Sequence, residues 1–135
     1  MSERTLVLLK PDAVRRGLVG NVLSRFEAKG LSIVAMELRT IDPEKADEHY
    51  AEHVEKAFYP PLRDFVTSGP LVACVLEGDE AIEVVRAING ATDGRKAAPG
   101  TIRGDLSLSN RENLVHGSDS AESAEREIKI WFPNL

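Results

Sequence analysis

Four apolar stretches separated by helical patterns constrain the fold of this chain more than any other feature. They read RTLVLLK, LSIVAMELRT, LVACVLEG and NLVH (residues 4–10, 31–40, 71–78 and 113–116), and each has the length and composition of a strand. A chain of 135 residues is the usual size of one domain. No repeat or linker divides it, so we expect a single domain spanning residues 1–135.

The segments between these strands carry helix start and stop signals. The predicted helices run from Val19 to a stop at Gly30, from Asp42-Pro43-Glu44 through residue 53, over residues 60–68 before Gly69, from a cap at Asp79 to Gly90, and onward from Ser120. Residues 89–113 show little periodicity. Long irregular segments in compact domains are usually functional.

The order of these elements favours a ferredoxin-like α+β sandwich, an antiparallel sheet covered by helices on one face. A doubly wound parallel sheet remains an alternative, because the pattern alone does not set strand direction.

Composition narrows the class of function. Seventeen basic and 22 acidic residues give a net charge of −5, which argues against a general binder of nucleic acid or of anionic membranes. The single cysteine, Cys74, lies in an apolar run and is expected to be a buried, reduced thiol. The apolar run near the N-terminus is too short for a signal peptide or a membrane span, so a cytoplasmic protein is expected.

His116 is the strongest candidate for chemistry. It stands where the strand NLVH meets the run Gly-Ser-Asp-Ser, and side chains at such a boundary tend to emerge at an accessible surface. Ser118 and Ser120 lie at the start of the last helix, whose free amides attract anions, although simple N-capping is an alternative role.

Glu127 is the second candidate. Ala124, Ile128 and Trp131 form the apolar stripe of the last helix, and Glu127 falls within that stripe. A carboxylate on a buried face needs a partner, and a histidine held by it would be oriented and made more nucleophilic. A glutamate at the flank of the helix, reaching solvent, is the alternative.

Several separate groups could converge on a polyphosphate. These are Lys10 at the end of the first strand, Arg86, Arg103, Thr92 and Thr101. Phe58 could stack on a nucleobase if it is exposed, although such an aromatic is more often part of a core. There is no P-loop motif and no G-x-G-x-x-G after a strand.

The segment His49-Tyr50-Ala51-Glu52-His53 matches the H-x-x-E-H pattern of inverted zinc peptidases. Two histidines four residues apart share a helix face and could bind zinc. The pattern is short enough to recur by chance, so a solvated helix face is the better interpretation of His49 and His53.

Taken together, these pieces resemble the nucleoside diphosphate kinase family over essentially the whole chain. The matching segments are ERTLVLLKPDAV, SRFE, KGL, HYAEH, SGP, GATD, APGTIRGD and NLVHGSDSAESAEREI, in the right order and spacing. The N-x-x-H-G-S-D-S block is highly specific. The likeness is greatest to short bacterial enzymes of actinobacterial type.

The resemblance implies a magnesium-dependent enzyme that transfers the γ-phosphate of a nucleoside triphosphate, usually ATP, to a nucleoside diphosphate. His116 would be phosphorylated on Nδ1 in a ping-pong reaction, with Tyr50, Ser118 and Glu127 around it. The nucleotide-binding residues would be Phe58 for the base, Lys10 and Asn113 for the ribose, and Arg86, Thr92 and Arg103 for the phosphates. No residue would hold Mg²⁺ directly, since the phosphates would carry it.

Two further points follow from the resemblance. The family forms hexamers or tetramers, so a homo-oligomer is implied, without membrane or specific nucleic-acid partners. Ala57 stands where the family usually has proline, and Tyr59 where it has a second phenylalanine, a departure that concerns the rigidity of the pocket rim. A non-catalytic nucleotide-binding module of the same fold is the rival interpretation.

Overall fold

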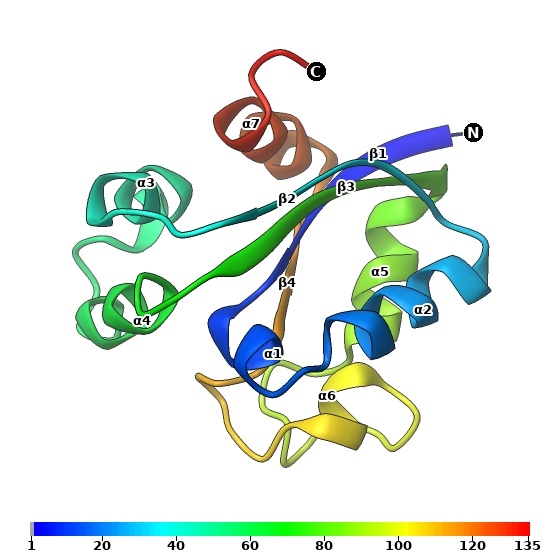
Figure 1. Cartoon of the computed structure of the whole chain (residues 1–135), viewed down its shortest axis with the longest axis horizontal. Coiled ribbons are helices and arrows are strands. Elements are labelled where there is room, and N and C mark those ends of the chain that lie inside the picture. Colours follow the sequence, from blue (N-terminus) through cyan, green and yellow to red (C-terminus); the bar gives the residue numbers. More distant parts are fainter. Residues whose placement is uncertain (1) are drawn as a thin grey trace.

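The computed structural model describes residues 2–135 and contains one four-stranded sheet in the order β2-β3-β1-β4 (Figure 1). The strands are β1 (Ser2–Leu9), β2 (Ser32–Arg39), β3 (Leu71–Asp79) and β4 (Val115–Gly117). Each of the three neighbouring pairs is antiparallel. The ferredoxin-like α+β prediction is therefore confirmed, and the doubly wound parallel alternative is wrong.

The helices form two groups on opposite faces of the sheet (Figure 1). One core includes residues of α1 (Pro11–Arg15), α2 (Val19–Lys29), α5 (Ala81–Asn89) and α6 (Ile102–Leu106). The other core includes residues of α3 (Pro43–His49), α4 (Tyr59–Val66) and α7 (Ala121–Trp131). The prediction that helices cover only one face was therefore wrong.

The two central strands explain the second layer of helices. Successive side chains of a strand point to opposite faces, so an uninterrupted apolar run needs apolar cover on both. In β1, Val7 and Leu9 enter one core while Leu6 and Leu8 enter the other. Cys74 of β3 is buried and free, as expected, and burial raises the pKa of its thiol to about 12.

Helix ends agree with the sequence signals at most positions. Gly30 ends α2 with a left-handed backbone (φ 110°), and the Ser120 side chain caps α7 by accepting from the Ser123 amide at 3.1 Å. The predicted cap at Asp79 is wrong, because the N-cap residue of α5 is Glu80. The carboxylate of Glu3 instead accepts the Ile82 amide at 2.9 Å.

Two segments differ from the predicted pattern. The helix expected through residue 53 ends at His49, and a short 3₁₀ turn, Ala51–His53, follows it. The stretch expected to be irregular contains the short helix α6. Within residues 2–135, no helix has the length and apolar character needed to span a membrane.

Candidate active site

A cavity of about 700 Å³ lies beside β4, with walls from α3, α5, α7 and the segment between α5 and β4. The sequence-predicted site residues that line it are Lys10, Tyr50, Arg86, Thr92, Arg103, Asn113, His116 and Glu127. An adjoining hollow of about 550 Å³ shares Lys10, Thr92 and Asn113 with the cavity and adds Phe58. The fold thus brings together residues that lie far apart in the sequence.

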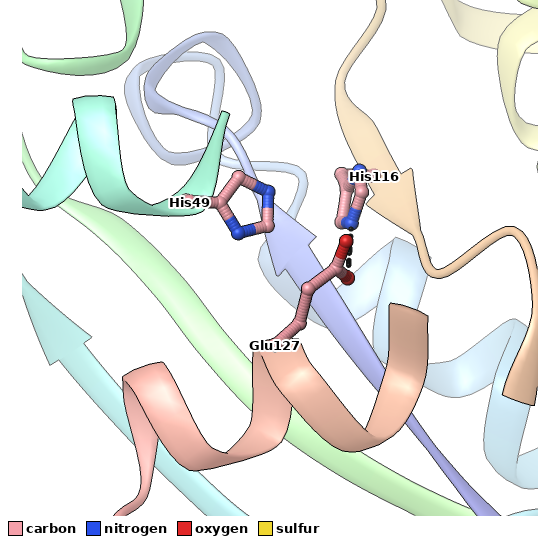
Figure 2. A group of neighbouring side chains, drawn as sticks. All are labelled: His49, His116 and Glu127. Carbon is pink, nitrogen blue, oxygen red and sulfur yellow. Dashed lines mark hydrogen bonds and ion pairs between the residues drawn. The ribbon is translucent and has the colours of Figure 1, made fainter. Parts of the chain in front are cut away.

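His116 is held by a carboxylate on one side only (Figure 2). Its Nε2 lies 2.9 Å from Oε1 of Glu127. Because a carboxylate accepts, Nε2 carries the proton and Nδ1 of the neutral ring keeps a lone pair. Nδ1 makes no hydrogen bond to any residue in the described range 2–135. The histidine side chain remains 20% exposed, so this free nitrogen belongs to a reachable ring.

Glu127 is 5% exposed and projects from the inward face of α7. The hydroxyl of Ser118 donates to the same oxygen, Oε1, at 2.8 Å. Two donors thereby pair with Oε1 of this buried carboxylate, and Ser118 fixes its orientation, while Arg126 lies 3.9 Å from Oε2. Ser118 itself is fully buried behind Glu127 and does not line the cavity, so it is not part of an anion-binding helix end.

Two buried cations line the same cavity. Lys10 is 6% exposed and donates from Nζ to Oδ1 of Asn113 at 3.0 Å. Burial, and then the neighbouring Arg103, lowers the pKa of Lys10 to about 8. Burial, followed by Arg86, lowers the pKa of Arg103 to about 10. The wall therefore holds positive charge at neutral pH that an anionic ligand would stabilise.

Arg103 also holds the backbone around the site. Its guanidinium donates to the carbonyls of Asn113 at 3.2 Å, Gly90 at 2.9 Å and Val115 at 2.6 Å. Within residues 2–135, Arg86 makes one hydrogen bond, which it donates to the carbonyl of Asp119 at 3.4 Å. Arg86 is therefore freer to move toward a ligand than Arg103 is.

The backbone between Asn113 and His116 is strained at Leu114, which has a positive φ of 74°. The carboxylate of Asp12 accepts the Leu114 amide at 3.1 Å, and the Leu114 carbonyl accepts the Lys10 amide at 2.8 Å. Burial raises the pKa of Asp12. Asp12 was not predicted as a site residue, although its place beside Lys10 and Pro11 was a usable signal.

Tyr50 and the two threonines differ in their roles. The Tyr50 hydroxyl is buried without a hydrogen-bond partner in the described chain, and burial raises its pKa. Thr92 lines both hollows. Thr101 does not line the cavity, because its hydroxyl caps α6 by accepting the Gly104 amide at 3.0 Å. The expectation that Thr101 joins a polyphosphate site was wrong.

Phe58 is 53% exposed and stands at the open end of the adjoining hollow. It is not part of the core. Its nearest ring neighbour is His53, with ring centroids 5.5 Å apart. An exposed aromatic face beside a polar hollow can stack on a planar base.

His49 is not on a solvated helix face, so that interpretation was wrong. It is 2% exposed, and the indole nitrogen of Trp131 donates to its Nδ1 at 3.0 Å. Potential ligand atoms of His49, His116 and Glu127 lie within 4.8 Å of one another. His53 lies outside this group, so the H-x-x-E-H histidines do not form a zinc centre together. The missed signal was Trp131, a buried donor on the stripe that carries Glu127.

Comparisons with known proteins point in one direction. A family model described as nucleoside diphosphate kinase matches residues 3–135. A nucleoside diphosphate kinase from Nocardioides sp. is 82% identical over 135 residues, which cover 100% of both chains, and one from Thermobifida fusca is 64% identical over 98% of both. The solved structure of a halophilic nucleoside diphosphate kinase from Halobacterium salinarum in complex with CDP is 49% identical with a TM-score of 0.96, covering 99% of this chain and 90% of that one.

Proposed function

Because the chain belongs to the nucleoside diphosphate kinase family of phosphotransferases, we propose that it transfers the γ-phosphate of a nucleoside triphosphate, usually ATP, to a nucleoside diphosphate through a phosphohistidine on His116. One observation carries this proposal. Glu127 holds the protonated Nε2 of His116 at 2.9 Å, and this leaves the Nδ1 lone pair available beside a cationic cavity.

The transfer occurs in two steps through one cavity. The Nδ1 lone pair of His116 forms a bond to the γ-phosphorus, while the bond to the β-phosphate oxygen breaks and the diphosphate leaves with that electron pair. The phosphorylated ring is then positively charged, and the carboxylate of Glu127 stabilises this charge through Nε2–H. A β-phosphate oxygen of a second diphosphate next attacks the phosphorus and restores the neutral histidine. Two polyphosphates therefore never occupy the cavity together.

The other site residues take the remaining parts of the nucleotide. We assign Arg86, Arg103 and Thr92 to the phosphates, where guanidinium groups neutralise charge on the moving phosphoryl group. Lys10 and Asn113, already joined at 3.0 Å, would hold the ribose hydroxyls, and Phe58 would stack on the base. Tyr50 is assigned to the wall beside His116, where its hydroxyl would find the partner that it lacks in the described residues.

Mg²⁺ would reach the site on the nucleotide. This cation prefers oxygen ligands in an octahedral arrangement. The cluster that the described residues offer combines two imidazoles with one carboxylate, so it does not suit Mg²⁺. Phosphate oxygens would hold the ion instead, and a bound Mg²⁺ would neutralise part of their charge.

The rival function is a nucleotide-binding module that keeps the fold without the chemistry. A coupled assay with ATP and dTDP separates the two, since only the kinase forms dTTP and ADP. His116→Ala should retain nucleotide binding and lose both turnover and labelling by γ-³²P-ATP. Labelling that survives in this variant would refute the assignment of His116.

We further propose that the protein works in the cytoplasm as a homo-oligomer. The edge strand β2 supports assembly, because it pairs on one side only and exposes Met36 at 52% and Leu38 at 66%. Light scattering on the purified chain tests this point, and a monomer at micromolar concentration would contradict it.

A further inference from the structure

One buried polar atom beside the cavity plays no part in the transfer described above. Nε2 of His49, at the C-terminal end of α3, is buried and makes no hydrogen bond within the described residues. Buried polar groups are nearly always paired, and exceptions tend to occur at functional sites. The position of this atom next to His116 gives it such a function.

Trp131 determines where the His49 proton sits. An indole N–H can only donate, and it donates to Nδ1 of His49 at 3.0 Å. Burial, and then the nearby charges of His116, Arg126 and Lys10, lowers the pKa of His49 well below its ordinary value. The ring is therefore neutral, and its single proton lies on Nε2.

This proton excludes His49 from a metal centre in its present arrangement. Metal ligation at Nε2 needs a lone pair on that nitrogen. Because Nδ1 accepts from Trp131, the proton of the neutral ring lies on Nε2 and occupies the position that a metal ion would need. The grouping of His49, His116 and Glu127 within 4.8 Å therefore has a different explanation.

The two imidazoles meet edge to face. Their centroids are 4.7 Å apart and their planes differ by 81°. Figure 2 shows the edge of His49, with a ring nitrogen, directed toward the face of His116, while Glu127 approaches His116 from α7. An N–H directed at an aromatic face is favourable when that ring is neutral and unfavourable when it is cationic.

We propose that His49 is a positioning residue for the transfer, whose Nε2–H, directed by Trp131, keeps His116 in the uncharged form with a free lone pair on Nδ1. The inference rests on the proposed role of His116. Glu127 opposes His49, because a carboxylate favours a doubly protonated imidazole, which cannot attack. The phosphorylated ring differs from the protonated ring, because the negative oxygens of the phosphoryl group offset its charge. The N–H of His49 therefore disfavours protonation of His116 more than its phosphorylation.

Other charged groups also line the cavity with His116. They are the cations Lys10, Arg86, Arg103 and Arg126 and the carboxylates Glu52, Glu83 and Asp119, and His53 is a further titratable group. These cations also disfavour a charged His116, but the phosphates of a bound nucleotide would neutralise them. The N–H of His49 does not depend on the nucleotide and would keep its effect.

The test is the pH dependence of a single chemical step. His49→Phe keeps a ring of similar shape and removes the N–H. Phosphorylation of the enzyme by γ-³²P-ATP, measured in a single turnover from pH 5.5 to 9, should be about 3- to 10-fold slower than wild type at pH 6 and within about two-fold of it at pH 8.5. A role in packing alone would lower the rate by the same factor at every pH.

His53→Phe is the matched control. His53 lies four residues further along, is half-buried and forms a hydrogen bond with Lys56 at 2.9 Å. Its loss should leave the acid limb of the pH profile, the fall in phosphorylation rate toward low pH, at its wild-type position. Trp131→Phe keeps His49 but removes the hydrogen bond that holds its proton on Nε2. This variant should shift the acid limb in the same direction as His49→Phe.

Nitrogen NMR of the wild-type protein without nucleotide provides a second readout that requires no variant. The spectrum should place the His49 proton on Nε2 at pH 7. A proton on Nδ1, or an unmoved acid limb in His49→Phe, overturns the inference. A wild-type enzyme that forms no phosphohistidine would instead overturn the proposed function, so the two failures are distinguishable.

Discussion

The two ends of the cavity proposed to bind the nucleotide differ in how firmly their side chains are held. At the His116 end, Glu127, Ser118 and His49 are each at most 5% exposed, and each forms at least one hydrogen bond. At the other end, Phe58 is 53% exposed, and its ring lies 5.5 Å from the ring of His53 and 5.8 Å from Nζ of Lys56. Chemistry needs fixed distances, whereas stacking on a base needs only an accessible flat surface.

The loosely held end still has an anchor next to it. Tyr59, at the position of the second family phenylalanine, is 1% exposed, and its hydroxyl donates to Asp47 at 2.7 Å. Tyr59 thus ties the start of α4 to α3 while Phe58 remains free. The contrast between a held and a free side chain therefore exists even between adjacent residues. Substitutions at the two ends should differ in the size of the activity loss and in whether kcat or KM changes.

The largest effect is expected for Arg103→Met, at the held end. Three backbone carbonyls lose their donor and the phosphates lose a buried cation. We expect kcat/KM to fall about 1,000-fold and the free energy of unfolding to fall by about 3 kcal/mol. Steady-state assays and urea denaturation measure the two quantities.

Arg95→Met is the control for that change. Among the described residues Arg95 forms an ion pair with Asp93 alone, and its side chain is 64% exposed, so kcat/KM should stay within about two-fold of wild type. Equal losses at both arginines would mean that burial does not distinguish the two positions.

Glu127→Gln should have the next largest effect. The amide keeps the shape and an acceptor oxygen but removes the charge that, in the proposed mechanism, stabilises the phosphorylated ring. Phosphoenzyme formation should slow about 10- to 100-fold, with little change in nucleotide affinity. Glu125→Gln, on the exposed face of the same helix, should leave the rate unchanged. A rate for Glu127→Gln equal to that of Glu125→Gln would remove Glu127 from the mechanism.

The features that the sequence could predict are those that depend on local patterns. Strands, most helix ends and the inward position of Glu127 are local patterns, and each is present in the structure. The pairing of Glu127 with His116 followed because a buried carboxylate needs a donor. The second helical layer was also implied by the uninterrupted apolar runs of β1 and β3, although the prediction did not use them.

Several of the errors concern contacts made across the fold. His49 looked solvated because its helix is polar, and only the packing of α3 against α7 brings it to Trp131. The cap of α5 comes from Glu3, at the far end of the sequence. The strain at Leu114 and its support by Asp12 likewise join segments about a hundred residues apart. Local periodicity carries no information about such pairs.

A smaller, pH-dependent effect is expected at Lys10. Its pKa of about 8 lies below the ordinary 10.5, so Lys10 loses its charge as the pH rises through 8 in the free enzyme. Bound phosphates favour the charged form. ADP affinity should therefore fall above pH 8, by about ten-fold at most for each pH unit. Titration calorimetry at pH 7 and pH 9 measures this change, and Lys10→Met should remove the dependence.

The lowered pKa of Lys10 also predicts the direction in which the free energy of unfolding changes with pH. Its folded pKa is lowered, so between pH 8 and 10.5 the unfolded chain binds more protons at this residue than the folded chain does. This residue alone therefore makes the free enzyme more stable as the pH rises through that window. Stability and ADP affinity should change in opposite directions there, and a parallel change would contradict burial as the cause.

The smallest effect is expected at the exposed end, for Phe58→Ala. Loss of one stacking surface should raise KM about five-fold and leave kcat within about two-fold, because no group near the phosphoryl transfer changes. The increase should be similar for ADP, GDP and dTDP, since a ring face carries no donor or acceptor that reads the base. Phe58→Trp should restore the wild-type KM. A fall in kcat for Phe58→Ala would show that the exposed end also positions the phosphates, and the distinction between the two ends would then disappear.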